Sequence, residues 1–155
     1  NLSTLSLPNV ISIGDSAFRG CSNLSTLSLP NVISIGDSAF AYCSRLQYIS
    51  LYNCSSIGNS VFASCSSLSW VKTGKLTSLT QSMFYNCNNL SEVYIEYSDV
   101  PLTLYNNNLN YVFESSPMSL SGSGIFYVKT SALRLAYAAA SGWSAISSRI
   151  VVSSF

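Results

Sequence analysis

The chain has 155 residues, of which 48% are apolar and 8% charged, with a net charge of +1 and no histidine. This apolar content is enough for one substantial core, whereas a nearly uncharged surface has no long-range attraction for nucleic acid or an anionic membrane. The chain lacks the commonest general base and metal ligand, and it has no apolar run of about 18 residues that could cross a bilayer. We therefore expect no nucleic-acid partner, no membrane insertion and no cofactor.

The N-terminal part of the chain repeats with a period of 22 residues. The first two copies differ only at Arg19 and Gly20, which are replaced by Ala41 and Tyr42. One unit of this length cannot bury its own apolar face, so successive units stack on one another. The period therefore predicts a solenoid that acts through a surface rather than through a catalytic pocket. The copies cover residues 1–22, 23–44, 45–66, 67–88 and, in part, 89–96.

Each copy is expected to form one coil that begins with a short strand. In the second copy Leu27 and Leu29 alternate with Thr26 and Ser28, which is the period of a strand with one apolar and one polar side. A Pro-Asn turn signal and a second short strand at 32–35 follow. The first strands of successive coils should pair side by side into a parallel sheet.

The rest of each coil is expected to be a helical turn that brings a phenylalanine and a cysteine into the interior. In the second copy this turn covers 38–43, and Asp37 or Ser38 should cap it by accepting hydrogen bonds from its free N–H groups. The structural core ladder that results consists of Phe18, Phe40, Phe62 and Phe84 with Cys21, Cys43, Cys65 and Cys87.

The five cysteines allow three interpretations, of which we favour buried free thiols. Four of them occur once per repeat, and the fifth, Cys54, replaces the valine of the earlier copies. A metal site needs closely spaced cysteines with partner ligands, which the sequence lacks. Neighbouring coils lie roughly 5 Å apart, within reach of a disulfide, but equivalent side chains in a stack point in parallel. Thiols that act as small hydrophobic groups fit this arrangement better.

The pattern LxxLxLPxxVxxIGxxAFxxC, repeated closely over residues 1–96, resembles the BspA-like class of bacterial leucine-rich repeats. The resemblance implies a leucine-rich repeat solenoid of the α/β type, with a parallel sheet on one face and short strands and helical turns on the other. It also implies a secreted or cell-surface bacterial protein used in adhesion or partner binding, without a family-wide active site. Pro30 gives way to Tyr52 and then Gly74, so the later coils should be less regular.

After Ile95 the repeat frame is lost, and residues 97–123 are expected to form an irregular insertion. Consecutive asparagines, prolines and a Ser-Gly run favour loops here. Some apolar residues of this segment, such as Leu102 and Val112, should still lean on the core.

A C-terminal cap is predicted over residues 124–155. A strand at 124–128 should add one rung to the sheet, and the segment 131–143 that follows should contain a helix that Ser131 caps and Gly142 ends. An amphipathic helix over the last coil would cover the open end of the stack, and the segment also resembles the tail common after such arrays. The residues expected to pack beneath this helix are Trp143, Ile146 and Ile150.

No comparable cap precedes the first strand, whose backbone edge and apolar side chains should therefore be bare. Asn1 begins in the middle of the array and is not a methionine. We expect the chain to be a fragment or processed product of a longer protein with further repeats upstream, or else to self-associate through this N-terminal edge.

The outward-facing residues of the first strands form columns down the predicted stack. Thr4 and Thr26 are followed in one column by Tyr48, Trp70 and Glu92. Large aromatic side chains with charged neighbours are favoured in binding surfaces. The alternative is that these residues only stabilise the sheet by packing across strands. The candidate binding residues are Tyr48, Tyr52, Trp70, Lys72, Glu92, Tyr94 and Glu96.

The expected function is non-enzymatic binding or adhesion, outside the cell or at its surface, with a protein as first and a glycan as second candidate partner. The alternatives are a structural spacer and a targeting module of a larger enzyme or viral fibre. Asp15 and Asp37 are repeat equivalents suited to turns rather than to catalysis. Glu92 and Glu96 are at best a retaining-type carboxylate pair on an open face, with no pocket to raise a pKa.

Overall fold

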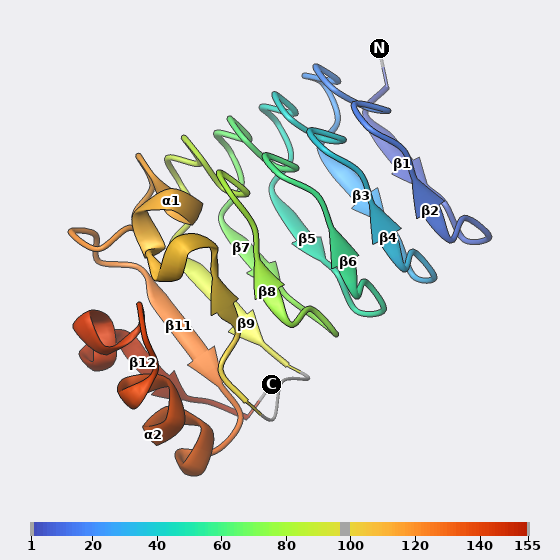
Figure 1. Ribbon diagram of the computed structural model, residues 1–155. Helices are drawn as coiled ribbons and strands as arrows, with labels where there is room; N and C mark the ends of the chain where they lie inside the picture. The colour runs from blue at the N-terminus through green and yellow to red at the C-terminus, as the bar shows by residue number, and fades with distance from the viewer. Residues whose placement is uncertain (1, 97–99, 155) are drawn as a thin grey trace.

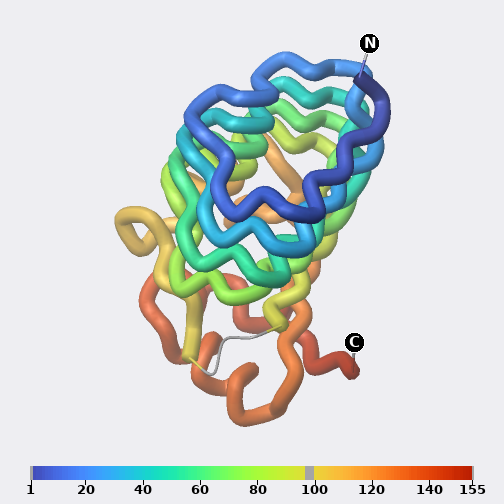
Figure 2. Tube along the Cα trace, turned by 90° about the vertical axis from the view of Figure 1, so that its right-hand side faces the viewer, coloured from blue at the N-terminus to red at the C-terminus, as the bar shows by residue number. Residues whose placement is uncertain are grey.

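The computed structural model describes residues 2–96 and 100–154. Over these residues the chain winds into a stack of coils, with the first coil at one end and the C-terminal helices at the other (Figure 1). A view turned by 90° shows successive coils lying over one another (Figure 2). The parallel pairing of strands from neighbouring coils confirms the predicted solenoid.

Each of the first four coils contributes two short strands on two sides of the stack. The first strands are β1 (Thr4–Ser6), β3 (Thr26–Ser28), β5 (Tyr48–Ser50) and β7 (Trp70–Lys72). The second strands are β2 (Ser12–Ile13), β4 (Ser34–Ile35), β6 (Ser56–Ile57) and β8 (Ser78–Leu79).

The register of the strands equals the repeat period. Thr26 lies beside Thr4 in the pair β1–β3, Trp70 lies beside Tyr48 in β5–β7, and β3 lies next to β5 in the stack. Because side chains alternate along a strand, the middle residue of each first strand points inward, and Ile49 is fully buried. Equivalent side chains of successive coils therefore form straight columns inside and outside.

The third side of each coil consists of turns whose capping differs from our prediction. Asp37 does not cap its own turn, because its Oδ1 accepts a hydrogen bond from the backbone N–H of Asn59 in the next coil, at 2.7 Å. Ser38 adopts a left-handed conformation with φ of 55°, and its N–H donates to the carbonyl of Asn59 at 2.9 Å. The N–H groups at the start of the turn thus point along the stack and not back to the aspartate of their own coil.

Stacked phenylalanine rings occupy the interior opposite the first strands. The ring centroids of Phe18 and Phe40 are 5.3 Å apart, and the next two intervals, to Phe62 and to Phe84, are each 5.8 Å. The interplanar angles are 6–8°. Phe40, Phe62 and Phe84 have no exposed surface, so this ladder forms the continuous core of the stack.

All five cysteines are free thiols, and Cys43, Cys65 and Cys87 each donate to a carbonyl of the preceding coil. The Sγ–H of Cys65 donates to the carbonyl of Phe40 in the preceding coil at 3.2 Å, and Cys87 donates likewise to Phe62 at 3.1 Å. Burial raises the pKa of the Cys87 thiol to about 12. These thiols stay protonated and act as apolar groups with one weak donor each.

We expect iodoacetamide to label Cys21 before the other cysteines of the native chain at mildly alkaline pH. Cys21 is half-buried in the first coil, whereas burial raises the pKa of the Cys43 thiol to about 12 and that of Cys54 to about 11. Alkylation requires an accessible thiolate. Intact mass should show five labels after unfolding without a reductant, and fewer than five would contradict the free-thiol assignment.

The fifth coil begins with β9 (Glu92–Ile95), which pairs with β7. Residues 97–99 of the predicted insertion lie outside the described residues. The described remainder follows the course of a coil although its sequence has left the repeat frame. Its elements are β10 (Thr103–Leu104), the 3-10 helix η1 (Tyr105–Asn107) and α1 (Leu109–Phe113).

Contacts with the fourth coil place this segment in the stack. Thr103 of β10 pairs with Ser78 of β8, and the N–H of Phe84 donates to the carbonyl of Val112 at 3.0 Å. Phe113 stacks on Phe84 with centroids 5.3 Å apart. The fifth coil thus reaches the same three sides as the earlier coils, with a longer path between its strands.

The C-terminal segment extends the sheet by two strands and covers its end (Figure 1). The first of these strands pairs with β9, as predicted, and the second pairs with the first. The second strand is an addition that the sequence analysis did not predict. Among the described residues, no helix is both long enough and apolar enough to cross a membrane. The elements are β11 (Ile125–Val128), α2 (Ser131–Ala139), the 3-10 helix η2 (Ser144–Arg149) and β12 (Ile150–Val152).

The bounds of α2 differ from the predicted helix at both ends. Thr130, and not Ser131, is the N-cap, because its backbone is extended and its Oγ1 accepts from the N–H of Leu133 at 3.1 Å. The helix ends at Ala139, before Gly142, because Ala140 leaves the helical conformation with ψ of 146°. Gly142 instead passes close to the fifth coil, where a Cβ atom would lie 2.4 Å from the carbonyl oxygen of Asn107.

Two aromatic side chains attach the C-terminal segment to the fifth coil. The N–H of Leu102 donates to Tyr137 Oη, and Trp143 Nε1 donates to the carbonyl of Leu102, each at 2.8 Å. Both aromatic side chains are fully buried. Both backbone groups of one residue are therefore satisfied by this segment, which stabilises the junction.

At the opposite end the first coil is only partly covered. Leu5, Leu7 and Phe18 are partly buried, whereas their equivalents in the second coil are buried. Among the described residues, β1 pairs on one edge only, with β3. The first coil therefore exposes apolar side chains that every later coil encloses.

Candidate binding surface

The candidate binding residues lie on the outer face of the first-strand sheet. Trp70 lies between Tyr48 and Glu92 in the register of β5, β7 and β9, and Lys72 lies beside Tyr94. The same register places Tyr127 of β11 beside Tyr94. The alternation of the strands thus directs the predicted residues to one face.

Four of these side chains are in contact and form what we call the aromatic row, Tyr48, Trp70, Tyr94 and Tyr127. The rings of Tyr48 and Trp70 stack with centroids 4.9 Å apart, and those of Tyr94 and Tyr127 stack at 4.7 Å. Trp70 and Tyr94 meet edge to face at 6.3 Å. The row crosses four strands without interruption.

Charged side chains flank the aromatic row and are paired. Tyr94 Oη donates to Glu92 Oε2 at 2.9 Å, and Lys72 Nζ lies 3.5 Å from Glu96 Oε1. Lys72 Nζ also lies 6.0 Å from the centroid of the Tyr94 ring. Burial, followed by the hydrogen bond and charge of Glu92, raises the pKa of Tyr94 to about 12, so this phenol stays protonated near neutral pH.

The acidic residues considered as a possible catalytic pair each interact with another group of the chain. Glu92 accepts from Tyr94, and Glu96 pairs with Lys72. Asp15 Oδ1 accepts from the backbone N–H of Asp37, at 2.8 Å. Each of these carboxylates has a structural interaction that explains its presence on an open surface.

One residue of the surface was missed by the sequence analysis. Tyr127 completes the aromatic row, but it lies outside the repeat frame and was considered only as part of a capping strand. Extending the column from Tyr94 to the predicted strand 124–128 could have identified it.

The candidate residues differ in exposure. Tyr52, which follows β5, is 47% exposed, and Tyr48 is 37% exposed. The other three rings of the row are half-buried.

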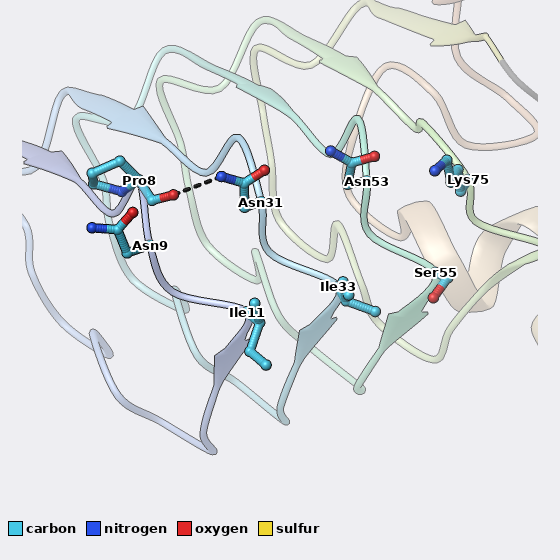
Figure 3. A pocket seen from close by; sticks show the side chains of 8 residues that line it. All are labelled: Pro8, Asn9, Ile11, Asn31, Ile33, Asn53, Ser55 and Lys75. Carbon is cyan, nitrogen blue, oxygen red and sulfur yellow. Dashed lines mark hydrogen bonds between the residues drawn. The ribbon is translucent and has the colours of Figure 1, made fainter.

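A second surface feature is an open groove of about 610 Å³ on the side of the first coils (Figure 3). Asn31 Nδ2 donates to the carbonyl of Pro8 at 2.7 Å and helps to form its wall. Ile11 and Ile33 are 63% and 50% exposed. These two isoleucines were not considered in the sequence analysis, and strand alternation would not have identified them, because Ile13 and Ile35, two residues further on, are buried. The groove is lined by Pro8, Asn9, Ile11, Asn31, Ile33, Asn53, Ser55 and Lys75.

The parallel strands, columns of buried Leu, Ile and Val, and interior phenylalanines define a leucine-rich repeat solenoid. Residues 1–112 match the family model described as BspA type leucine rich repeat region, in six copies. The chain belongs to this family.

Solved structures agree with this fold. The chain is similar to a leucine-rich repeat protein from Bacteroides ovatus, with 29% identity, a TM-score of 0.57, and coverage of 68% of this chain and 27% of that one. It is also similar in fold to the leucine-rich repeat protein TpLRR of T. pallidum, with 22% identity, a TM-score of 0.52, and coverage of 60% and 58%. The chain thus spans about a quarter of the first structure and under two thirds of the second. No curated protein matches the chain.

Family membership gives a general class of function. Leucine-rich repeats are protein-interaction modules, and proteins of this kind are generally non-catalytic. Repeats of the BspA type are typical of bacterial surface or secreted proteins.

Proposed function

We propose that the chain is a non-enzymatic binding or adhesion module that recognises its partner with the sheet face around the aromatic row. The observation that carries this proposal is a continuous row of four contacting aromatic side chains beside Lys72, Glu92 and Glu96. Such side chains offer large contact area at low cost in conformational entropy. Tyr52 at the end of β5 widens the surface.

The proposed partner is an extracellular protein, with a glycan as second candidate. Stacking covers one face of Tyr48 and Trp70, and likewise of Tyr94 and Tyr127, which reduces the ring area on which a sugar could stack. The paired charges at the rim offer hydrogen-bonding and electrostatic contacts suited to a protein. The typical occurrence of the family supports a location outside the cell or at its surface.

We expect the variant Tyr48→Ser/Trp70→Ser/Tyr94→Ser to lose binding to any partner found in a screen of extracellular proteins and a glycan array. The loss follows from removal of most of the aromatic contact area. The matched control is Ile11→Ser/Ile33→Ser, which removes exposed apolar area from the groove instead. Surface plasmon resonance would compare the three chains, and circular dichroism would establish that each is folded.

Two outcomes would contradict the proposal. Equal binding by the triple variant would place the site elsewhere, and loss only in the isoleucine variant would place it at the groove. No partner for any chain would favour the structural alternative, in which the rings pack across strands to stabilise a spacer. The half-burial of Trp70 by its neighbours is the observation that favours this alternative.

The exposed edge of the first coil supports a further proposal, self-association of this chain through β1. An unpaired edge with adjacent apolar side chains is a template for another strand, and Leu2 at this end is 39% exposed. Sedimentation of the chain before the binding screen checks this proposal. A single monomeric species across the concentration range would contradict it.

A further inference from the structure

The aromatic row has a second property, which does not depend on any partner. Its four members are tyrosines and a tryptophan, the aromatic side chains that lose an electron most readily. The centroid distances along the row are 4.9, 6.3 and 4.7 Å, so neighbouring rings are in van der Waals contact. The interior ladder consists of phenylalanines, which are much harder to oxidise. An electron vacancy (a hole) can therefore move along the surface row more easily than through the phenylalanine core.

The row also contains one built-in proton acceptor. Removal of an electron from a phenol makes its hydroxyl strongly acidic, so a tyrosine is oxidised easily only where a base takes the proton. Tyr94 Oη donates to Glu92 Oε2 at 2.9 Å. Among the described residues, the hydroxyls of Tyr48 and Tyr127 and the indole N–H of Trp70 have no hydrogen-bond partner within the chain. Tyr94 is thus the member of the row at which electron loss and proton transfer are coupled.

We propose that the loss of one electron from the aromatic row ends as a radical on Tyr94, with Glu92 as the proton acceptor. A one-electron oxidant takes an electron from Trp70 and leaves its radical cation. Tyr94 then gives an electron to Trp70, and the phenolic proton passes to Glu92 Oε2. The products are a neutral Tyr94 radical, a protonated Glu92, the original Trp70 and an oxidant reduced by one electron.

The placement of the other acidic residue explains why Glu92 has this role and Glu96 does not. Glu96 is paired with Lys72 Nζ at 3.5 Å, and its side chain is 11% exposed. The carboxylate of Glu96 is thus engaged by an ammonium group and not by a phenol of the row. Glu92 instead accepts directly from the phenol. Glu92 in β9 and Glu96 just after it are therefore not equivalent, because only Glu92 is hydrogen-bonded to a phenol of the row in the described residues.

The test is flash photolysis with tris(bipyridyl)ruthenium(III), generated in the presence of the whole chain. Transient absorption follows the indolyl signal and the part of the tyrosyl signal that grows as the indolyl signal decays. This coupled component should be present in the unchanged chain and lost in Tyr94→Phe. It should also be lost in Glu92→Gln, which removes the base but keeps the size of the side chain.

Two matched variants separate the role of Tyr94 and Glu92 from general effects on the surface. Glu96→Gln removes a neighbouring carboxylate, and Tyr127→Phe removes the hydroxyl of the ring stacked on Tyr94. Both should keep the coupled component. Persistence of that component in Tyr94→Phe, or in a folded Glu92→Gln chain, would overturn the proposal. An equal loss in Glu96→Gln would also overturn it, and the Tyr94→Phe result decides the question even if Glu92→Gln does not fold.

Discussion

Replacing Phe62 with alanine is expected to lower the free energy of unfolding by about 3–5 kcal/mol. Phe62 has no exposed surface, and its ring stacks on Phe40 and on Phe84 with centroids 5.8 Å away on each side. The substitution leaves a cavity that the flanking rings cannot fill, because backbone hydrogen bonds between coils hold them in register. A urea titration followed by circular dichroism would measure the change.

Phe18→Ala is the matched control for this prediction. Phe18 occupies the same position of the repeat but is only partly buried, with a stacked ring on one side. The cost of this substitution should be clearly smaller, because less apolar surface returns to water. Equal losses for the two variants would contradict the assignment of Phe62 to a closed interior and of Phe18 to an open end.

Replacing Trp143 with alanine should have an effect of similar size, about 3–5 kcal/mol, at the other end of the stack. The Trp143 side chain is fully buried and meets Phe126 and Tyr137 edge to face, with centroids 4.9 and 4.8 Å away. Its Nε1 also donates to the carbonyl of Leu102 at 2.8 Å. The alanine variant removes this packing and leaves a buried acceptor without its partner. Thermal and urea unfolding would measure the loss.

The second tryptophan of the chain provides the comparison. Trp70→Ala removes a half-buried ring from the outer face of the sheet, so its cost should be much smaller. Trp143→Phe keeps an aromatic ring but removes the donor, and it should cost about 1–3 kcal/mol through the unsatisfied carbonyl. A smaller loss for Trp143→Ala than for Trp70→Ala would contradict the role of Trp143 in attaching the C-terminal segment.

The repeat frame allowed the stack and its register to be predicted in detail. A period of 22 residues puts Thr26 beside Thr4 and Trp70 beside Tyr48, as the structure shows. The prediction succeeded because the first four coils have the same length, so one alignment of the sequence places every column within them.

The frame gave less information after Ile95, where the interval between equivalent residues changes. Leu104 pairs with Leu79 of β8, and Phe113 stacks on Phe84, so both intervals exceed the repeat period. A fixed period cannot locate such residues, although their apolar character agrees with an interior position. The strand β12 was missed because Ile150–Val152 is only three residues long, has no apolar–polar alternation in its sequence, and lies outside the repeat frame.

The candidate surface was predictable as a set of positions but not as a set of contacts. The alternation of the strands placed Tyr48, Trp70 and Tyr94 on the outer face. The edge-to-face meeting of Trp70 with Tyr94 and the bond from Tyr94 to Glu92 depend on side-chain torsions, which the sequence pattern does not specify. These contacts are the ones on which the radical proposal depends.

The hydrogen bonds between coils also determine how the chain responds to tension. They run along the long axis of the stack, and within residues 2–96 each coil bonds to the coils beside it. A force applied between the two ends of the stack therefore loads the interfaces between coils in series. We expect the first coil, which contains β1 and is the least covered, to separate first. Each of the first four coils then releases about 75 Å of extended chain, while the segment held by Tyr137 and Trp143 remains folded until the end. We expect a stack built in this way to lengthen stepwise under load and to dissipate energy at every step.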